Sequence, residues 1–249
     1  MRYVTSFLLY FGAFLTASAQ ISPPGLDDTR GVLWGAVGFT QNLGPKWQTM
    51  VYAGASRESN PNNFSVLSKP AISVIDVSQL YRIDEHWSLS AAVSYREQNR
   101  YSDEPPYESK DPAIRDEIRY YMRVYYRHKV NRIALTYSFR PEFRTYHPSA
   151  ILYEYRFRLK GQVAIPLNKT SSNQLIVGNE ILTVAEPRFA DYHYTEDRAT
   201  IYFRHTFANP SLIADVGLMS QVLAGEGLIT HVAFDFIFVD PFGKRSSKK

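Results

Sequence analysis

A strict two-residue alternation along residues 114–127 constrains the fold more than any other feature of the sequence. Arg115, Glu117 and Arg119 occupy one side of this segment, and apolar residues such as Ile118 and Met122 occupy the other. Successive side chains of a β-strand point to opposite faces, whereas a helix would mix the two sets around its circumference. The segment is therefore predicted to be a strand with one charged face and one apolar-aromatic face.

The same alternation returns in residues 133–144, 154–165, 198–207 and 231–238, so the pattern predicts an all-β chain. Two architectures accommodate such strands. A soluble sandwich or lipocalin-like barrel would bury the apolar face, whereas a membrane barrel turns that face to lipid and the polar face to its lumen.

Strand length and aromatic content favour the membrane form. The alternating segments exceed the about 5–6 residues of ordinary strands and suffice for a tilted membrane crossing of about 9–11 residues. Aromatic residues reach 14% although the mean hydropathy is −0.28, and tyrosines gather near the predicted strand ends, as interfacial girdles require. We therefore expect a closed antiparallel transmembrane β-barrel with a polar lumen lined by Arg, Glu and Tyr.

The alternating segments and the turn residues between them define the expected strands. These are Gly31–Thr40, Lys46–Arg57, Ala71–Ile83, Trp87–Asn99, Ile114–Arg127, Arg132–Thr145, Ile151–Ile165, Gln174–Ala185, Glu196–Phe207, Ser211–Leu223 and Leu228–Val239. Bacterial single-chain barrels have an even number of strands. We therefore expect about 12 strands, with an additional one within residues 60–78, or 10 if the first segment does not span fully.

The connections alternate between short and long. Short ones at residues 84–86, 128–131 and 208–210 are interpreted as periplasmic turns, and longer ones at 56–70, 100–112 and 186–195 as extracellular loops. Residues 100–112 are polar and proline-rich, which predicts that they form no strand.

The first residues are typical of a secretory signal peptide, expected at residues 1–19. Arg2 is followed by the short apolar stretch Phe7–Leu15 and by the small residues Ala17 and Ala19, which suit cleavage before Gln20. The remaining residues 20–249 are expected to form a single barrel domain with a short basic tail at 243–249. We expect the protein in the outer membrane of a Gram-negative bacterium, with membrane lipid and the barrel-assembly machinery as partners.

In such a barrel the charged faces would meet in the lumen. Arg presents a planar fork that binds carboxylates bidentately, so neighbouring strands could link Arg to Glu across the interior. The residues expected in this network are Glu117, Arg119, Arg123, Arg140, Glu142, Arg144, Arg156, Arg158, Glu180, Arg198 and Arg204. The network is interpreted as structural; the alternative is a narrow anion-selective pore or a small-ligand-binding barrel, since Arg exceeds Glu and rings of Arg select anions.

An enzyme is the less favoured hypothesis. An outer-membrane lipid hydrolase would need a serine and a histidine, for which Ser138, Ser220, His205 and His231 are candidates without diagnostic spacing. No cofactor, catalytic residue or metal site is predicted. The net charge of +4 comes partly from the basic tail and from Arg2, and the other arginines are spread through the alternating segments, so nucleic-acid binding is not expected.

From Arg115 onward the order of several short motifs resembles an uncharacterised family of bacterial outer-membrane β-barrels, domain-of-unknown-function family 2490. The motifs are Asp116-Glu117-Ile118-Arg119, Arg140-Pro141-Glu142-Phe143-Arg144, Tyr155-Arg156-Phe157-Arg158-Leu159, Ile165-Pro166-Leu167, Asn179-Glu180 and Asp197-Arg198, with Trp34 upstream. Asp197 departs from the asparagine expected there. The resemblance implies an outer-membrane barrel and no catalytic residues.

Overall fold

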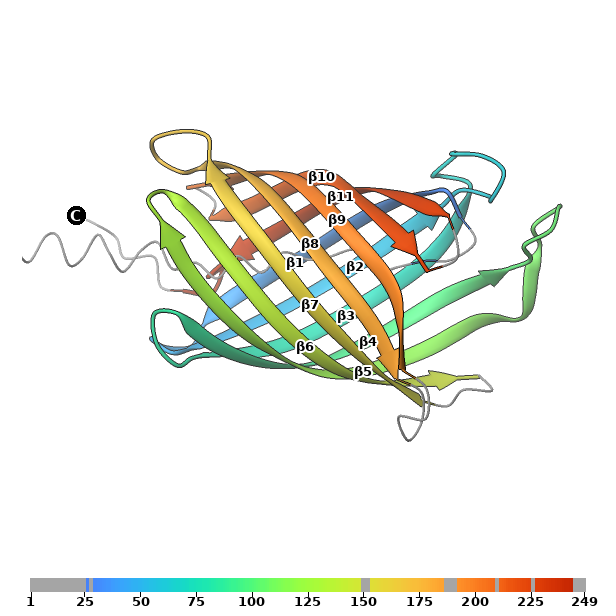
Figure 1. The fold of residues 1–249 in the computed structure, drawn as a ribbon, viewed down its shortest axis with the longest axis horizontal. Coiled ribbons are helices and arrows are strands. Elements are labelled where there is room, and N and C mark those ends of the chain that lie inside the picture. The colour runs from blue at the N-terminus through green and yellow to red at the C-terminus, as the bar shows by residue number, and fades with distance from the viewer. Residues whose placement is uncertain are drawn as a thin grey trace, which may run out of the picture.

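The strands follow one another around a single closed barrel (Figure 1). The structure is a computed structural model that describes residues 26, 29–148, 153–185, 192–208, 211–224 and 227–243. Within these ranges the chain forms eleven strands. They are β1 (Gly31–Asn42), β2 (Trp47–Glu58), β3 (Lys69–Arg82), β4 (Trp87–Tyr101), β5 (Ser109–Val130), β6 (Ile133–His147), β7 (Tyr153–Pro166), β8 (Asn173–Ala185), β9 (Tyr192–Phe207), β10 (Leu212–Leu223) and β11 (Leu228–Val239).

The barrel closes between its first and last strands. Every consecutive pair is antiparallel, whereas β1 and β11 run parallel, with Gly31 opposite Thr230 and Thr40 opposite Val239. An odd number of strands in an up-and-down order makes the first and last point the same way. The predicted closed all-β barrel is confirmed, and its eleven strands are near the expected count of about 12 or 10: β1 spans fully, and residues 60–68 form a connection without a further strand.

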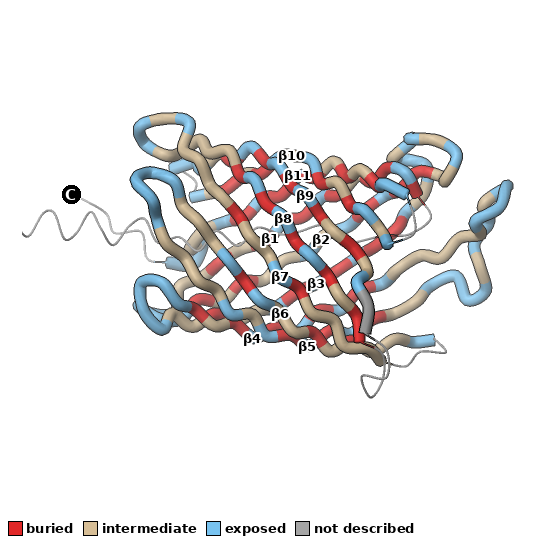
Figure 2. Tube along the Cα trace, in the orientation of Figure 1, coloured by how far each residue is buried: buried red, intermediate tan, exposed pale blue. Residues whose placement is uncertain are grey.

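Burial alternates along the strands, with charged residues inside. In β5, Glu117, Arg119 and Tyr121 are buried, whereas Ile118 and Tyr120 are exposed (Figure 2). Soluble proteins place apolar side chains in the core and rarely bury Arg or Glu. The barrel therefore has the inverse arrangement, with a largely apolar outer surface around a charged interior.

The outer surface carries large apolar side chains on every strand. Among the apolar side chains of the alternating segments, Leu135 and Phe157 are half-buried, and five on β5, β6 and β9 are exposed. The exposed five are Ile118, Met122, Phe139, Ile201 and Phe203. A continuous apolar surface of this extent marks an interaction surface in a protein.

The hairpin between β4 and β5 extends beyond the barrel wall (Figure 1). Tyr101 pairs with Ser109 after an irregularity between Asn99 and Tyr101, so only residues 102–108 remain as the turn. The prediction that all of residues 100–112 lack strand structure is wrong. Pro112 is tolerated because the hairpin rises past its neighbours, where a missing backbone N–H interrupts no inner ladder.

The two barrel ends differ in their connections. The turns at residues 43–46, 83–86 and 131–132 share one end with the last residue of β11, and the connections at 59–68 and 102–108 share the other end with the first residue of β1.

In the turn at residues 83–86, Asp84 accepts hydrogen bonds from the backbone N–H groups of Trp87 and His86, at 2.7 and 2.8 Å. These bonds lower the pKa of its carboxyl group.

Several predictions fall on residues that the structure does not describe. These are the signal peptide at 1–19, the tail after residue 243 and most of the connection at 186–195. No helix among the described residues has the length and apolar character that a membrane crossing requires.

Candidate functional site

The interior of β5–β9 holds all the residues predicted for the charge network. Those that form ion pairs have side chains at most 15 % exposed. They are distributed over five adjacent strands: Glu117, Arg119 and Arg123 on β5, Arg140, Glu142 and Arg144 on β6, Arg156 and Arg158 on β7, Glu180 on β8, and Arg198 and Arg204 on β9. We call these residues, with Arg96, Glu154 and Glu196, the charge lattice.

Glu117 is the centre of one part of the lattice. Its two carboxylate oxygens accept hydrogen bonds from Arg119, at 2.5 and 2.9 Å. Arg96 lies 3.4 Å from the same carboxylate, and Arg144 contacts it through Nε. Arg144 also pairs with Glu154. One buried carboxylate thus contacts guanidinium groups from three neighbouring strands, so each of these buried cations has an ionic partner.

A second part links β6 to β9. Glu142 lies 2.5 Å from Arg140 and 2.6 Å from Arg158, and Arg158 reaches Glu180 at 3.4 Å. Arg198 continues the chain of pairs, 3.6 Å from Glu180.

Glu196 extends this part of the lattice. It lies 2.8 Å from Arg198 and 3.3 Å from Arg156. Sequence reasoning placed Glu196 only at a strand start. It did not assign Arg96 to the network, although Arg96 lies on the same face of β4 as three buried serines.

Arg204 and Arg123 lie outside these two clusters. Arg204 binds Asp215 on β10 through two hydrogen bonds of 2.7 and 2.6 Å. Arg123 donates to the Tyr125 hydroxyl at 2.7 Å. Asp215 was not predicted, because the alternation on β10 is formed mostly by apolar residues on both faces.

A second interior region is apolar, and we call it the apolar interior. It contains Trp34, Ala36, Met50, Val74, Ile176, Tyr202, Ile213, Ala233 and Ile237. Trp34 is fully buried and donates from Nε1 to Asp235 at 2.9 Å. A Cβ atom on Gly54 would lie 2.4 Å from the Trp34 ring, so this close approach requires glycine.

The histidines considered for an enzyme are bonded to amides. Nε2 of His231 lies 3.0 Å from Oε1 of Gln221, and Nδ1 of His205 lies 2.5 Å from Oδ1 of Asn173. Ser220 is next to Gln221 but faces the opposite side of β10 from it. Among the described residues, no group of three or more His, Asp or Glu side chains could hold a metal ion.

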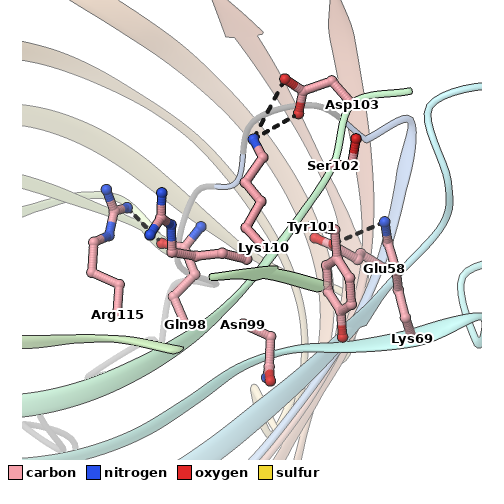
Figure 3. Close-up of a pocket in the computed structure, with 10 residues that line it drawn as sticks. Glu58, Lys69, Gln98, Asn99, Tyr101, Ser102, Asp103, Lys110 and Arg115 are labelled. Carbon is pink, nitrogen blue, oxygen red and sulfur yellow. Dashed lines mark hydrogen bonds and ion pairs between the residues drawn. The ribbon is translucent and has the colours of Figure 1, made fainter. Parts of the chain in front are cut away.

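A polar cavity of about 200 Å³ lies at the longer-loop end of the barrel (Figure 3). We call it the mouth pocket. It is lined by Glu58, Lys69, Gln98, Asn99, Arg100, Tyr101, Ser102, Asp103, Lys110 and Arg115, from the ends of β2–β5. No prediction assigned these residues a common site, because the bulge and the extended hairpin that bring them together are not visible in the alternation.

Fold and interior together define a closed β-barrel with a charged core. Residues 32–227 match the family described as "Protein of unknown function (DUF2490)". The match covers most of the chain, which therefore belongs to this family, as the motifs between Glu117 and Arg198 predicted. Comparison with curated proteins gives no significant match.

Proposed function

We propose that this protein is a barrel of the bacterial outer membrane whose exposed apolar face contacts lipid. Three features support the proposal. The outer surface carries large apolar side chains, and the interior carries the charged ones. Each strand is long enough for a tilted membrane crossing, which takes about 9–11 residues. The first residues are typical of a signal peptide. Membrane lipid and the machinery that inserts barrels are then its partners.

Within this barrel the charge lattice serves a structural role. The observation that carries this role is mutual pairing: Glu117, Glu142, Glu180 and Glu196 each contact at least two guanidinium groups. An anion-selective pore needs positive groups that remain available to the permeating ion. Here seven arginines of the lattice each already contact a carboxylate, so we infer a non-conducting, non-enzymatic barrel.

One observation favours the narrow anion-selective pore as a second candidate. Arg123 and Arg127 contact Tyr125, the first through a hydrogen bond and the second over the ring at 4.5 Å from its centroid. Both cations therefore contact neutral groups and would be available to an anion.

Planar-bilayer recording on the purified, refolded protein distinguishes the two candidates. We expect no single-channel steps from the wild type and none from Arg123→Ala, in which one of the two cations on Tyr125 is lost. Anion-selective steps whose selectivity falls in Arg123→Ala would contradict the structural role and support the pore.

A further inference from the structure

We propose that the mouth pocket binds a small phosphorylated anion. The inference goes beyond the proposed function, because it concerns the end of the barrel and holds whether or not the lumen conducts. The pocket is separate from the centre of the charge lattice, and Gln98 connects the two.

Charge balance indicates the sign and size of the ligand's charge. Four cations, Lys69, Arg100, Lys110 and Arg115, line the cavity together with two carboxylates, Glu58 and Asp103. A phosphomonoester carries a charge of about −1.5 to −2 at neutral pH and three strong acceptor oxygens. It would balance the excess of cations, which a monocarboxylate would leave half compensated.

Two of the cations are paired and hold the walls of the pocket. Lys69 lies 3.7 Å from Glu58 and 4.1 Å from the centre of the Tyr101 ring. Lys110, at the start of β5, lies 3.1 Å from Asp103 in the turn of the hairpin (Figure 3). These contacts connect β2, β3 and the extended hairpin, so the cavity is preorganised.

The two arginines contact neutral groups. Arg115 donates to the side-chain oxygen of Gln98 at 2.8 Å and lies over the Tyr146 ring, 5.3 Å from its centre. Arg100 donates to the backbone carbonyl of Pro112 at 3.3 Å. Each guanidinium has five donors and these bonds use few of them, so both can bind phosphate oxygens, the anion geometry that suits a guanidinium fork.

Gln98 links the pocket to the lattice without contributing a charge of its own. Its side-chain oxygen accepts from Arg115 at 2.8 Å and from Arg96 at 2.7 Å, and Arg96 in turn pairs with Glu117. Because Gln98 is an amide, it positions Arg115 without neutralising it. A glutamate there would keep the shape and remove the local positive charge.

Isothermal titration of the refolded full chain in neutral detergent, with inorganic phosphate and with glycerol 1-phosphate, tests the proposal. We expect saturable binding by the wild type and a loss of at least about tenfold in affinity in Gln98→Glu and Arg115→Gln, because charge-assisted hydrogen bonds are lost. Arg132→Gln provides the matched control, since this arginine is exposed at the opposite end of the barrel. Its affinity should equal that of the wild type.

The phosphate could belong to a soluble molecule or to a lipid headgroup, and a second arm distinguishes these sources. The same variants are reconstituted in vesicles containing phosphatidic acid, and retained lipid is measured by native mass spectrometry. Binding of the soluble probes assigns a soluble ligand; retention of phosphatidic acid alone, lost in Gln98→Glu, assigns a headgroup.

Three results would overturn the proposal: no saturable binding in either arm, equal affinity in Gln98→Glu and the wild type, or acetate binding as tightly as phosphate. The heat-induced gel shift verifies folding of each variant. Should Arg115→Gln fail to fold, Arg115→Lys keeps the charge while losing the planar fork, and is expected to bind phosphate more weakly than the wild type.

Discussion

The barrel interior solves the same packing problem in two different ways. Along β5–β9 it is filled by arginines and glutamates that form ion pairs with one another, whereas β1, β2, β10 and β11 supply much of the apolar interior around Trp34. In the first region the contribution of a side chain to stability depends on the charge of its neighbours. In the second region that contribution depends on how closely the neighbouring side chains pack. The same architecture should therefore respond to different substitutions in its two parts.

The largest effect is expected from Glu117→Gln, which removes a charge and little volume. Three guanidiniums would lose their shared carboxylate, so we expect a destabilisation of about 3–5 kcal/mol, the usual cost of breaking a buried pair. The measurement is the midpoint of urea unfolding in detergent, with the heat-induced gel shift as a second readout. Glu97→Gln, an exposed residue on the adjacent strand, serves as control and should unfold near the wild-type midpoint.

An unchanged midpoint in Glu117→Gln would mean that water, rather than the carboxylate, screens Arg96, Arg119 and Arg144. The contrast between the two interior regions would then disappear. Glu142→Gln is expected to lower the free energy of unfolding by less than Glu117→Gln does, because Glu142 contacts two guanidinium groups rather than three.

An intermediate effect is expected from Gly54→Ala in the apolar interior. The added methyl group would meet the Trp34 ring at 2.4 Å, so the ring or the strand must shift, at a cost of about 1–3 kcal/mol. Gly35→Ala is the matched control on the neighbouring strand, since a Cβ atom there would meet nothing within 4 Å. Equal midpoints for both variants would show that the apolar interior is loosely packed.

The smallest effect on stability, with the clearest topological result, is expected from cysteines at the two barrel ends. Glu108→Cys and Glu85→Cys both replace exposed residues in connections. On intact cells an impermeant thiol reagent should label the first and not the second, because longer loops are expected outside. The reverse labelling pattern would mean that the barrel is inserted with the short turns outside.

Sequence predicted the charged region better than the apolar one, for a physical reason. A charge on one face of a strand is visible in the alternation, so residues such as Arg119, Glu142 and Arg158 could be assigned to the interior from β5–β7 alone. Which carboxylate meets which guanidinium depends on the register between strands, which the alternation does not show. Glu196 was missed because it lies at a strand start, and Asp215 because β10 is apolar on both faces. Gly54 gives no periodic signal, because its requirement arises from a side chain on the neighbouring strand.

Strand number was the other limit of sequence reasoning. The predicted segments correspond one to one with β1–β11, and the expected counts of 12 and 10 each differ from eleven by one strand, because an even number was assumed. The sequence of a single strand does not show whether the first and last strands of the barrel pair parallel or antiparallel.

That closure has a mechanical consequence. Every other neighbouring pair in the wall is consecutive in the chain, so a covalent connection limits how far the two strands can separate. β1 and β11 meet at no hairpin, and parallel ladders are slightly less stable per residue than antiparallel ones. When the wall opens under load or thermal motion, this seam should part first, and amide protons of residues 31–40 and 230–239 should exchange before those of the tethered strands.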